Sequence, residues 1–97
     1  MPQVAKPVAV IRDSLPKIKE ISIPALVDHL SSLTPREEQI VRMRHGFTLG
    51  LENSQDSNLD AEKVGRRFCV TSHRINQIDA RALLKILERH NKWYHVL

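Results

Sequence analysis

The sequence has few cysteines, few aromatic residues and no long apolar run, and each shortage excludes a class of protein. Its 97 residues include one cysteine, Cys69, which excludes an internal disulfide and a cysteine-rich zinc site. Aromatic residues make up only 4%, so aliphatic helix packing is expected in place of a β-sandwich or an aromatic stacking platform. No apolar run approaches the roughly 20 residues that cross a membrane, and no hydrophobic signal region comes after Met1. These features predict one small, soluble, cytoplasmic domain of the all-α class.

The patterns of an enzyme active site are also absent. The chain has no glycine-rich phosphate loop, no carboxylate pair that can be placed in a cleft, and no nucleophile with a suitable base. His90 and His95 are not at the i, i+4 spacing of a helical zinc pair, and His29 and His45 fit ordinary helix positions. We therefore expect no catalysis, no metal site and no cofactor.

Residues 60–78 have the spacing of a helix-turn-helix. Asp60 and Thr71 can each cap a helix, and an apolar pair at the spacing of a hydrophobic staple accompanies each cap. The two caps are eleven residues apart, which leaves about eight residues for a first helix and about three for a turn. Gly65 costs about 1 kcal/mol against alanine in a helix, so we expect it to allow a close crossing of the two helices.

The outward side of the second predicted helix is polar. Its first turns carry Ser72, His73, Asn76 and Gln77, with Arg74 on the flank. A core needs none of these side chains, and all of them can reach base edges or phosphates. A helical bundle with a solvated polar face would show the same pattern, so both interpretations stay open.

Positive charge is concentrated in the second part of the chain. Residues 60–97 hold eight Lys or Arg against four Asp or Glu, whereas residues 1–59 hold seven of each. The whole formal excess of +4 therefore lies on the helix-turn-helix and the C-terminal residues after it. A one-sided basic surface is typical of a phosphate binder, and a solubilising face is the alternative.

The first 21 residues are expected to form a flexible, extended arm. They contain three prolines and show no helical period. The arm could become ordered against a partner or a second copy of the chain. Residues 22–97 are then the folded domain, an all-α helical bundle.

Two further helix starts precede the helix-turn-helix. Pro24 is acceptable only in a first turn, so a short helix should open at residue 22 or 23 and end at residues 31–32. Thr34 is predicted to cap the next helix, with Pro35 at its first position and Glu37 completing a capping box. Gly46 supplies the left-handed stop.

The remaining segments are a long loop and the C-terminal end. Residues 47–59 exceed the four to six residues usual between packed helices, so the loop should be mobile. The last helix is predicted from residue 72 to about residue 90. Residues 93–97 either fold back on the bundle, which we favour, or form an apolar patch for a partner.

Three blocks of sequence resemble region 4 of the bacterial sigma-70 family. They read L-T-P-R-E-E-Q-I-V-R-M-R-H-G at 33–46, V-G-R-R-F-x-V-T at 64–71 and R-I-x-Q-I-D-A-R-A-L-x-K-I at 74–86. The resemblance covers roughly the C-terminal two thirds. It implies that the helix from Thr71 enters the major groove of a promoter element, and that another face docks on the β flap of RNA polymerase. By position it also implies that Arg36 and Arg44 contact phosphates.

The match departs from the family at the reading helix. Family members usually read T-R-E-R-I-R-Q where this chain reads T-S-H-R-I-N-Q. Each lost bidentate contact is worth about 1 to 3 kcal/mol of discrimination, so the usual promoter element should not be preferred. Asp60 replaces a threonine that commonly touches phosphate. The chain also holds no counterpart of the domains that bind melted promoter, so we do not expect a complete sigma factor.

Two functions remain as hypotheses. The first is a bacterial, nucleoid-associated regulator that binds double-stranded DNA, with a dimer or RNA polymerase as co-anchor through the N-terminal arm or the C-terminal tail. Its predicted base-reading residues are Ser72, His73, Asn76 and Gln77, and its phosphate contacts are Arg36, Arg44, Arg66, Arg67 and Arg74. The second is a region 4 mimic that binds RNA polymerase or another transcription factor without specific DNA recognition.

Overall fold

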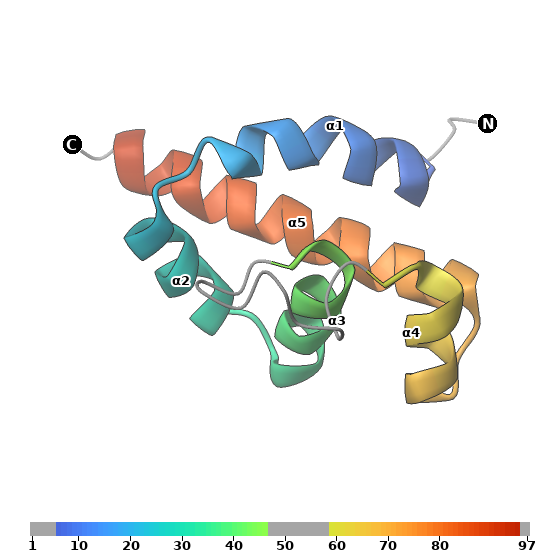
Figure 1. The fold of residues 1–97 in the computed structure, drawn as a ribbon. Helices are drawn as coiled ribbons and strands as arrows, with labels where there is room; N and C mark the ends of the chain where they lie inside the picture. Colours follow the sequence, from blue (N-terminus) through green and yellow to red (C-terminus); the bar gives the residue numbers. More distant parts are fainter. Residues whose placement is uncertain (1–5, 47–58, 96–97) are drawn as a thin grey trace.

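Five helices build the described part of the protein. The computed structural model describes residues 6–46 and 59–95, with side chains up to residue 92. The helices are α1 (Pro7–Lys19), α2 (Ile23–Ser31), α3 (Pro35–His45), α4 (Ala61–Phe68) and α5 (Ser72–His95). Helix α5 runs through the middle, with α1 along one side of it and α2, α3 and α4 on the other (Figure 1). The predicted all-α class is confirmed.

Helix α1 corrects the prediction for the N-terminal arm. Residues 7–19 are helical and packed on α5, so an extended arm is wrong for this segment. Pro7 stands in the first turn, where no backbone donor is needed, but Pro16 lies inside the helix. Ile11 and Ile18 are buried on the side that faces α5. Burying such a side chain gains about 1.5 to 3 kcal/mol, so the two together offset the roughly 3 kcal/mol cost of an internal proline.

The core consists of two apolar clusters, and α5 contributes to both. The larger cluster joins α1 and α2 to α5; its buried members are Ile11, Ile18, Ile21, Leu26, Leu30, Leu33, Val41, Ala80, Ala82, Leu83 and Ile86. The smaller cluster joins α3 to the helix-turn-helix and centres on Ile40, Val64 and Ile75, which are all fully buried. Residues of α5 belong to both clusters, so α5 packs against α1 and α2 as well as against the helices around the smaller cluster. The packing of α1 and α2 therefore also fixes the direction of the first turns of α5.

The predicted helix caps are confirmed. The hydroxyl of Thr34 accepts from the backbone nitrogen of Glu37 at 3.2 Å, and the carboxylate of Glu37 accepts from the backbone nitrogen of Thr34 at 3.1 Å. Asp60 accepts from the backbone nitrogen of Lys63 at 2.8 Å, and Thr71 caps α5 in the same way at 3.1 Å. Gly46 has the expected left-handed conformation, with φ 66°. Four local sequence signals therefore place the starts of α3, α4 and α5 and the end of α3.

The turn between α4 and α5 passes very close to Gly65. A Cβ atom on Gly65 would lie 2.7 Å from the carbonyl oxygen of Val70 and 3.3 Å from the carbonyl carbon of Thr71. The expected close approach is confirmed, and its partner is the backbone of the turn. Cys69 ends α4 in the left-handed conformation, with φ 58°. Glycine is the usual residue at such a helix end, so the sequence did not show this feature.

A buried polar network fastens α3 to α5. The carboxylate of Asp79 is fully buried and lies 2.8 and 2.9 Å from Nε2 of His45. Arg44 donates to Asp79 at 3.4 Å, to the carbonyl of Leu59 at 3.4 Å and to Oδ1 of Asn76 at 3.1 Å. The network therefore links the last turn of α3 to the second and third turns of α5.

A second polar contact joins α2 to the far part of α5. His29 is only 3% exposed, and its Nε2 lies 3.1 Å from Nδ1 of His90. Arg89 donates to Nδ1 of His29 at 3.2 Å, which requires a neutral imidazole with its proton on Nε2. Burial lowers the pKa of His29, and His90 and Arg89 lower it further, while Asp28 acts in the opposite direction.

Other predicted segments lie partly outside the described residues. The loop at 47–58 and residues 96–97 are not described. Helix α5 continues through His95, beyond the predicted end near residue 90, and the side-chain contacts of the tail are outside the described part. Within the described residues, no helix has the length and apolarity to cross a membrane, and no three His, Cys, Asp or Glu side chains could hold a metal ion together.

We predict that Gly65→Ala destabilises the protein by about 1 to 2 kcal/mol. A neighbour at 2.7 Å that is backbone cannot easily move, so overpacking should cost about 2 to 3 kcal/mol, and the better helix propensity of alanine offsets about 1 kcal/mol. Urea denaturation measures the change. Glu62→Ala is the control, because Glu62 is exposed on the same helix and should stay within about 0.5 kcal/mol of the wild type. Equal stability of the two variants would contradict the close approach.

We predict that Asp79→Ala lowers the free energy of unfolding by about 3 to 5 kcal/mol, because Arg44 loses a buried partner. Asp79→Asn keeps the shape of the side chain and should lower the free energy of unfolding by less. It can therefore be measured if the alanine variant does not fold. Thermal unfolding followed by circular dichroism measures both. Glu88→Ala removes an exposed ion pair with Lys92 and should cost at most about 1 kcal/mol. If Asp79→Ala lowered the free energy of unfolding no more than Glu88→Ala does, the stabilising role of the network would be contradicted.

We predict that His29 makes the protein less stable as the pH falls from about 7 towards 5. Above the ordinary pKa of 6.5, His29 is neutral in the folded and unfolded states, so it adds no pH dependence there. Below that value the unfolded chain takes up a proton first, because the pKa of folded His29 is lowered. Urea titrations at several pH values measure the slope.

His29→Gln should reduce this slope, whatever it does to absolute stability. The matched control is His73→Gln, because His73 is exposed at the start of α5. If His29→Gln and the wild type keep the same slope, His29 is not the group that titrates.

Candidate nucleic-acid interface

The first turns of α5 expose a polar surface. The cap at Thr71 starts the helix, and Ile75 in the first turn is fully buried in the core of the helix-turn-helix. Burial of Ile75 fixes the rotation of the helix, so the opposite side faces out. Four of the five residues predicted for this helix are exposed: Ser72, His73, Arg74 and Gln77.

Asn76 is the exception. It is half-buried, and its Oδ1 accepts from Arg44 at 3.1 Å. Arg44, a predicted phosphate contact, keeps only 17% of its side chain exposed and also donates to Asp79. The structure therefore brings these two predicted site residues together between α3 and α5, which favours a positioning role over direct contact.

Three of the exposed side chains are joined by hydrogen bonds. Nη1 of Arg74 donates to Oε1 of Gln77 at 3.4 Å, and Nε2 of Gln77 lies 3.2 Å from Nε2 of His73. Because the Gln77 amide nitrogen is a donor only, Nε2 of His73 accepts, which places the imidazole proton on Nδ1. The Gln77 amide thus makes hydrogen bonds with both Arg74 and His73 and keeps the three side chains together.

Further arginines lie beside this surface on α3 and α4. Arg36 stands at the start of α3, with its guanidinium 5.8 Å from the centroid of the Phe68 ring on α4. Arg66 pairs with Glu62 at 3.1 Å, and both side chains are more than 70% exposed. An ion pair this exposed contributes little to stability, so Arg66 can leave Glu62 for another anionic partner at a small cost in free energy. Arg67 is also exposed.

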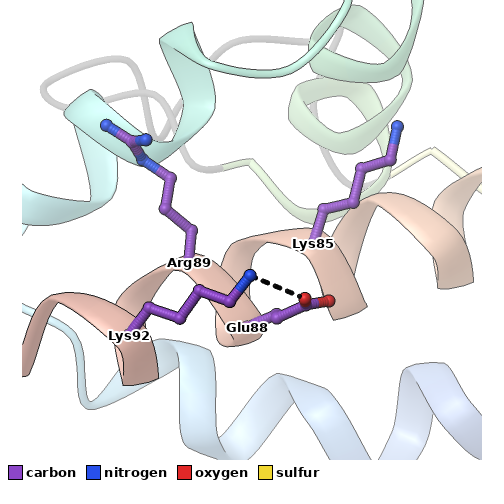
Figure 2. A pocket seen from close by; sticks show the side chains of 4 residues that line it. All are labelled: Lys85, Glu88, Arg89 and Lys92. Carbon is purple, nitrogen blue, oxygen red and sulfur yellow. Dashed lines mark ion pairs between the residues drawn. The ribbon is translucent and has the colours of Figure 1, made fainter. Parts of the chain in front are cut away.

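The cations in the second half of α5 have carboxylate partners. A shallow depression of about 330 Å³ is lined there by Lys85, Glu88, Arg89 and Lys92 (Figure 2). Lys92 pairs with Glu88 at 3.2 Å on the same helix. Lys85 reaches Glu37 on α3 at 2.7 Å, and Arg89 reaches Asp28 on α2 at 2.9 Å. These pairs neutralise one end of α5, so the excess positive charge lies near its beginning.

The carboxylate of Glu37 takes part both in the cap of α3 and in the ion pair with Lys85. Its burial would raise its pKa, but hydrogen bonds from Lys85 and from Thr34 outweigh burial and hold the pKa below the ordinary value. The carboxylate therefore remains charged at neutral pH.

The sequence reasoning missed Asp79 and His45. Asp79 lies one helical turn after the buried Ile75 and next to the buried Ala80, so its position predicts a carboxylate on the buried side of the helix. A buried carboxylate needs a partner, and that requirement was the available signal. Nothing local identified His45 or Arg44 as the partners, because both are more than 30 residues away along the chain.

Comparison with known proteins gives one family for this arrangement. The family described as Sigma-70, region 4 matches residues 29–87, which hold α3, α4 and parts of α2 and α5. Helix α1 lies outside the match. No solved structure gives a significant match.

Several curated relatives match over 59 to 63% of the chain. RNA polymerase sigma factor RpoD of Neisseria gonorrhoeae is 46% identical over 57 residues, which are 59% of this chain and 8% of the relative. RNA polymerase sigma factor SigA of Clostridium acetobutylicum is 44% identical over 61 residues, 63% of this chain and 15% of the relative. SigA of Listeria monocytogenes is 46% identical over a stretch of the same coverage. The chain thus spans a small fraction of their length, and on the match over residues 29–87 it belongs to the sigma-70 region 4 family.

Proposed function

We propose that this protein is a DNA-binding transcription regulator that inserts the beginning of α5 into the major groove. The observation that carries the proposal is the exposed polar side of the first turns of α5, beside the arginines of α3 and α4. A core does not need these side chains, and base edges and phosphates can use all of them. Family membership supports the proposal, because the matched relatives are named RNA polymerase sigma factors.

Base recognition would depend on Ser72, His73 and Gln77. A glutamine amide matches the N6 and N7 atoms of adenine, so Gln77 favours an adenine at its position. The bonds that Gln77 makes with Arg74 and His73 are exposed, so a base edge can replace them at little cost. Ser72 and His73 differ from the arginine and glutamate usual in the family, so the sequence read is expected to differ from the usual promoter element.

Phosphate contacts would come from Arg36, Arg66, Arg67 and Arg74, which are all exposed. Arg44 and Asn76 would act indirectly, because their contact with each other sets the position of α5 against α3. A single helix-turn-helix buries little surface, so we propose docking on RNA polymerase, at its β flap, as a second anchor.

A second candidate function is a protein-binding mimic of region 4. Its support is the position of Asn76, which takes one predicted base-reading side chain away from the outer surface. Such a protein would bind RNA polymerase or another transcription factor and show no specific DNA recognition.

Selection from random duplex DNA, with and without RNA polymerase, tests the two functions. We expect a defined motif for the wild type. Gln77→Ala should relax the preference at one position by about 5- to 150-fold, since a good bidentate contact is worth about 1 to 3 kcal/mol. Arg74→Ala should weaken binding to all sequences and reduce the salt dependence of log K by about one phosphate contact.

Matched controls come from the far end of the same helix. Asn91→Ala and Lys92→Ala remove an exposed amide and an exposed ammonium there, and neither should change DNA binding. Capture of RNA polymerase without any DNA motif would reject the regulator and support the mimic.

A further inference from the structure

An open cleft of about 560 Å³ lies between the beginning of α1 and the first half of α5. The two helices start at the same end of the molecule and run in the same direction (Figure 1). Helix α1 and the residue before it contribute Val10 and Lys6 to the lining, and α5 contributes Arg74, Arg81 and Leu84. The cleft thus borders the predicted reading surface on the side away from α3 and α4.

The charge of this cleft has one sign. Its lining includes Lys6, Arg74 and Arg81, together with His73, and no carboxylate. Within residues 6–46 and 59–95, no ion pair neutralises these three cations. The cations at the other end of α5 all have carboxylate partners. Charge complementarity therefore requires an anionic occupant.

The cleft is continuous with the reading surface. His73, Arg74 and Gln77 belong to both, so any occupant of the cleft lies beside whatever α5 reads. A helix in the major groove has a sugar-phosphate strand on each side. Helices α3 and α4 lie on one side of α5, and α1, which helps to line the cleft, lies on the other (Figure 1).

We propose that this cleft is a second phosphate anchor, in which Lys6 and Arg81 hold the DNA strand on the α1 side of the reading helix. The inference rests on the proposed DNA binding and adds a contact from the start of α1, which the family match does not include. Val10 and the 48% exposed Leu84 form an apolar floor against which deoxyribose rings can pack.

An acidic amphipathic peptide is the competing occupant. It would also suit an apolar floor with a cationic rim, but it would cover His73 and Gln77 and so exclude DNA from the reading helix. A DNA strand uses the cleft and the reading surface at once, which is why the duplex is favoured.

The test compares Lys6→Ala and Arg81→Ala with Lys17→Ala in the full chain. Lys17 is exposed near the other end of α1, so it is a matched control. Fluorescence anisotropy measures binding to a selected duplex and to an unrelated duplex of equal length over a range of salt concentrations. We expect each cleft variant to weaken binding to both duplexes by the same factor. The negative slope of log K against log salt should become less steep, its magnitude falling by about 0.9. Lys17→Ala should change neither quantity.

Leu84→Glu adds a second, opposite test, because it places a carboxylate in the cleft at an exposed position. This variant should bind both duplexes more weakly, while the midpoint of its thermal unfolding should stay close to that of the wild type.

Three results would overturn the inference. If the wild type binds DNA and Lys6→Ala has the slope of Lys17→Ala, the cleft holds no phosphate, although the proposed function stands. If Leu84→Glu abolishes binding of RNA polymerase but not of DNA, the cleft is a protein site. If the wild type binds no DNA, the proposed function fails and the anchor fails with it.

Discussion

The orientation of the first turns of α5, which we propose read DNA, depends on one buried carboxylate together with the buried Ile75. Asp79 is fully buried and joins two side chains from the last turn of α3 to the third turn of α5. Taking a charge out of water is costly, so such a contact adds little net stability over an apolar one. Its effect is directional, because the carboxylate must meet Arg44 and His45 together. The three groups together therefore constrain how α5 is placed against α3.

That constraint explains why Asn76 faces inward. Asn76 precedes Asp79 by three residues, so the two side chains lie on the same side of the helix. Arg44 bonds to both, which makes Asn76 an extension of the network. The same rotation of α5 turns His73, Arg74 and Gln77 outward. Exposure of the proposed reading residues and burial of Asp79 are therefore two consequences of one helix orientation.

The two ends of α5 differ in how their charges are used. In the second half, carboxylates from α2, α3 and α5 itself pair with Lys85, Arg89 and Lys92. In the first half, Arg74 and Arg81 face a cleft without carboxylates. Net charge alone did not reveal this division, since the sequence places all five cations in one basic segment. The partners of Lys85 and Arg89 lie on other helices, and only the fold brings them near.

Local sequence signals predicted where most of the helices begin. Contacts between residues far apart in the sequence determined the conformation of the N-terminal segment and the position of Asn76. The caps at Thr34, Asp60 and Thr71 depend on residues within three positions, so the sequence could place these helix starts. Prolines in the first 20 residues gave an equally local signal, and it was wrong, because burial of α1 against α5 outweighs the cost of Pro16. The exposure of the proposed reading residues could be predicted from the helical period, whereas the inward position of Asn76 depends on Arg44 from a distant helix.

Under the proposed function, helix α1 would add a DNA contact to a small domain of this family. A single module of this size buries roughly 600 to 1,000 Å² on DNA, and affinity then depends strongly on the number of phosphates neutralised. The region 4 match contains the arginines of α3 and α4, and these two helices lie on the side of α5 opposite to α1. Helix α1 brings Lys6 to the other side, where Arg81 already faces the cleft. Contacts on both strands restrict rotation about the axis of α5, so this added helix would improve the register of base reading as well as affinity.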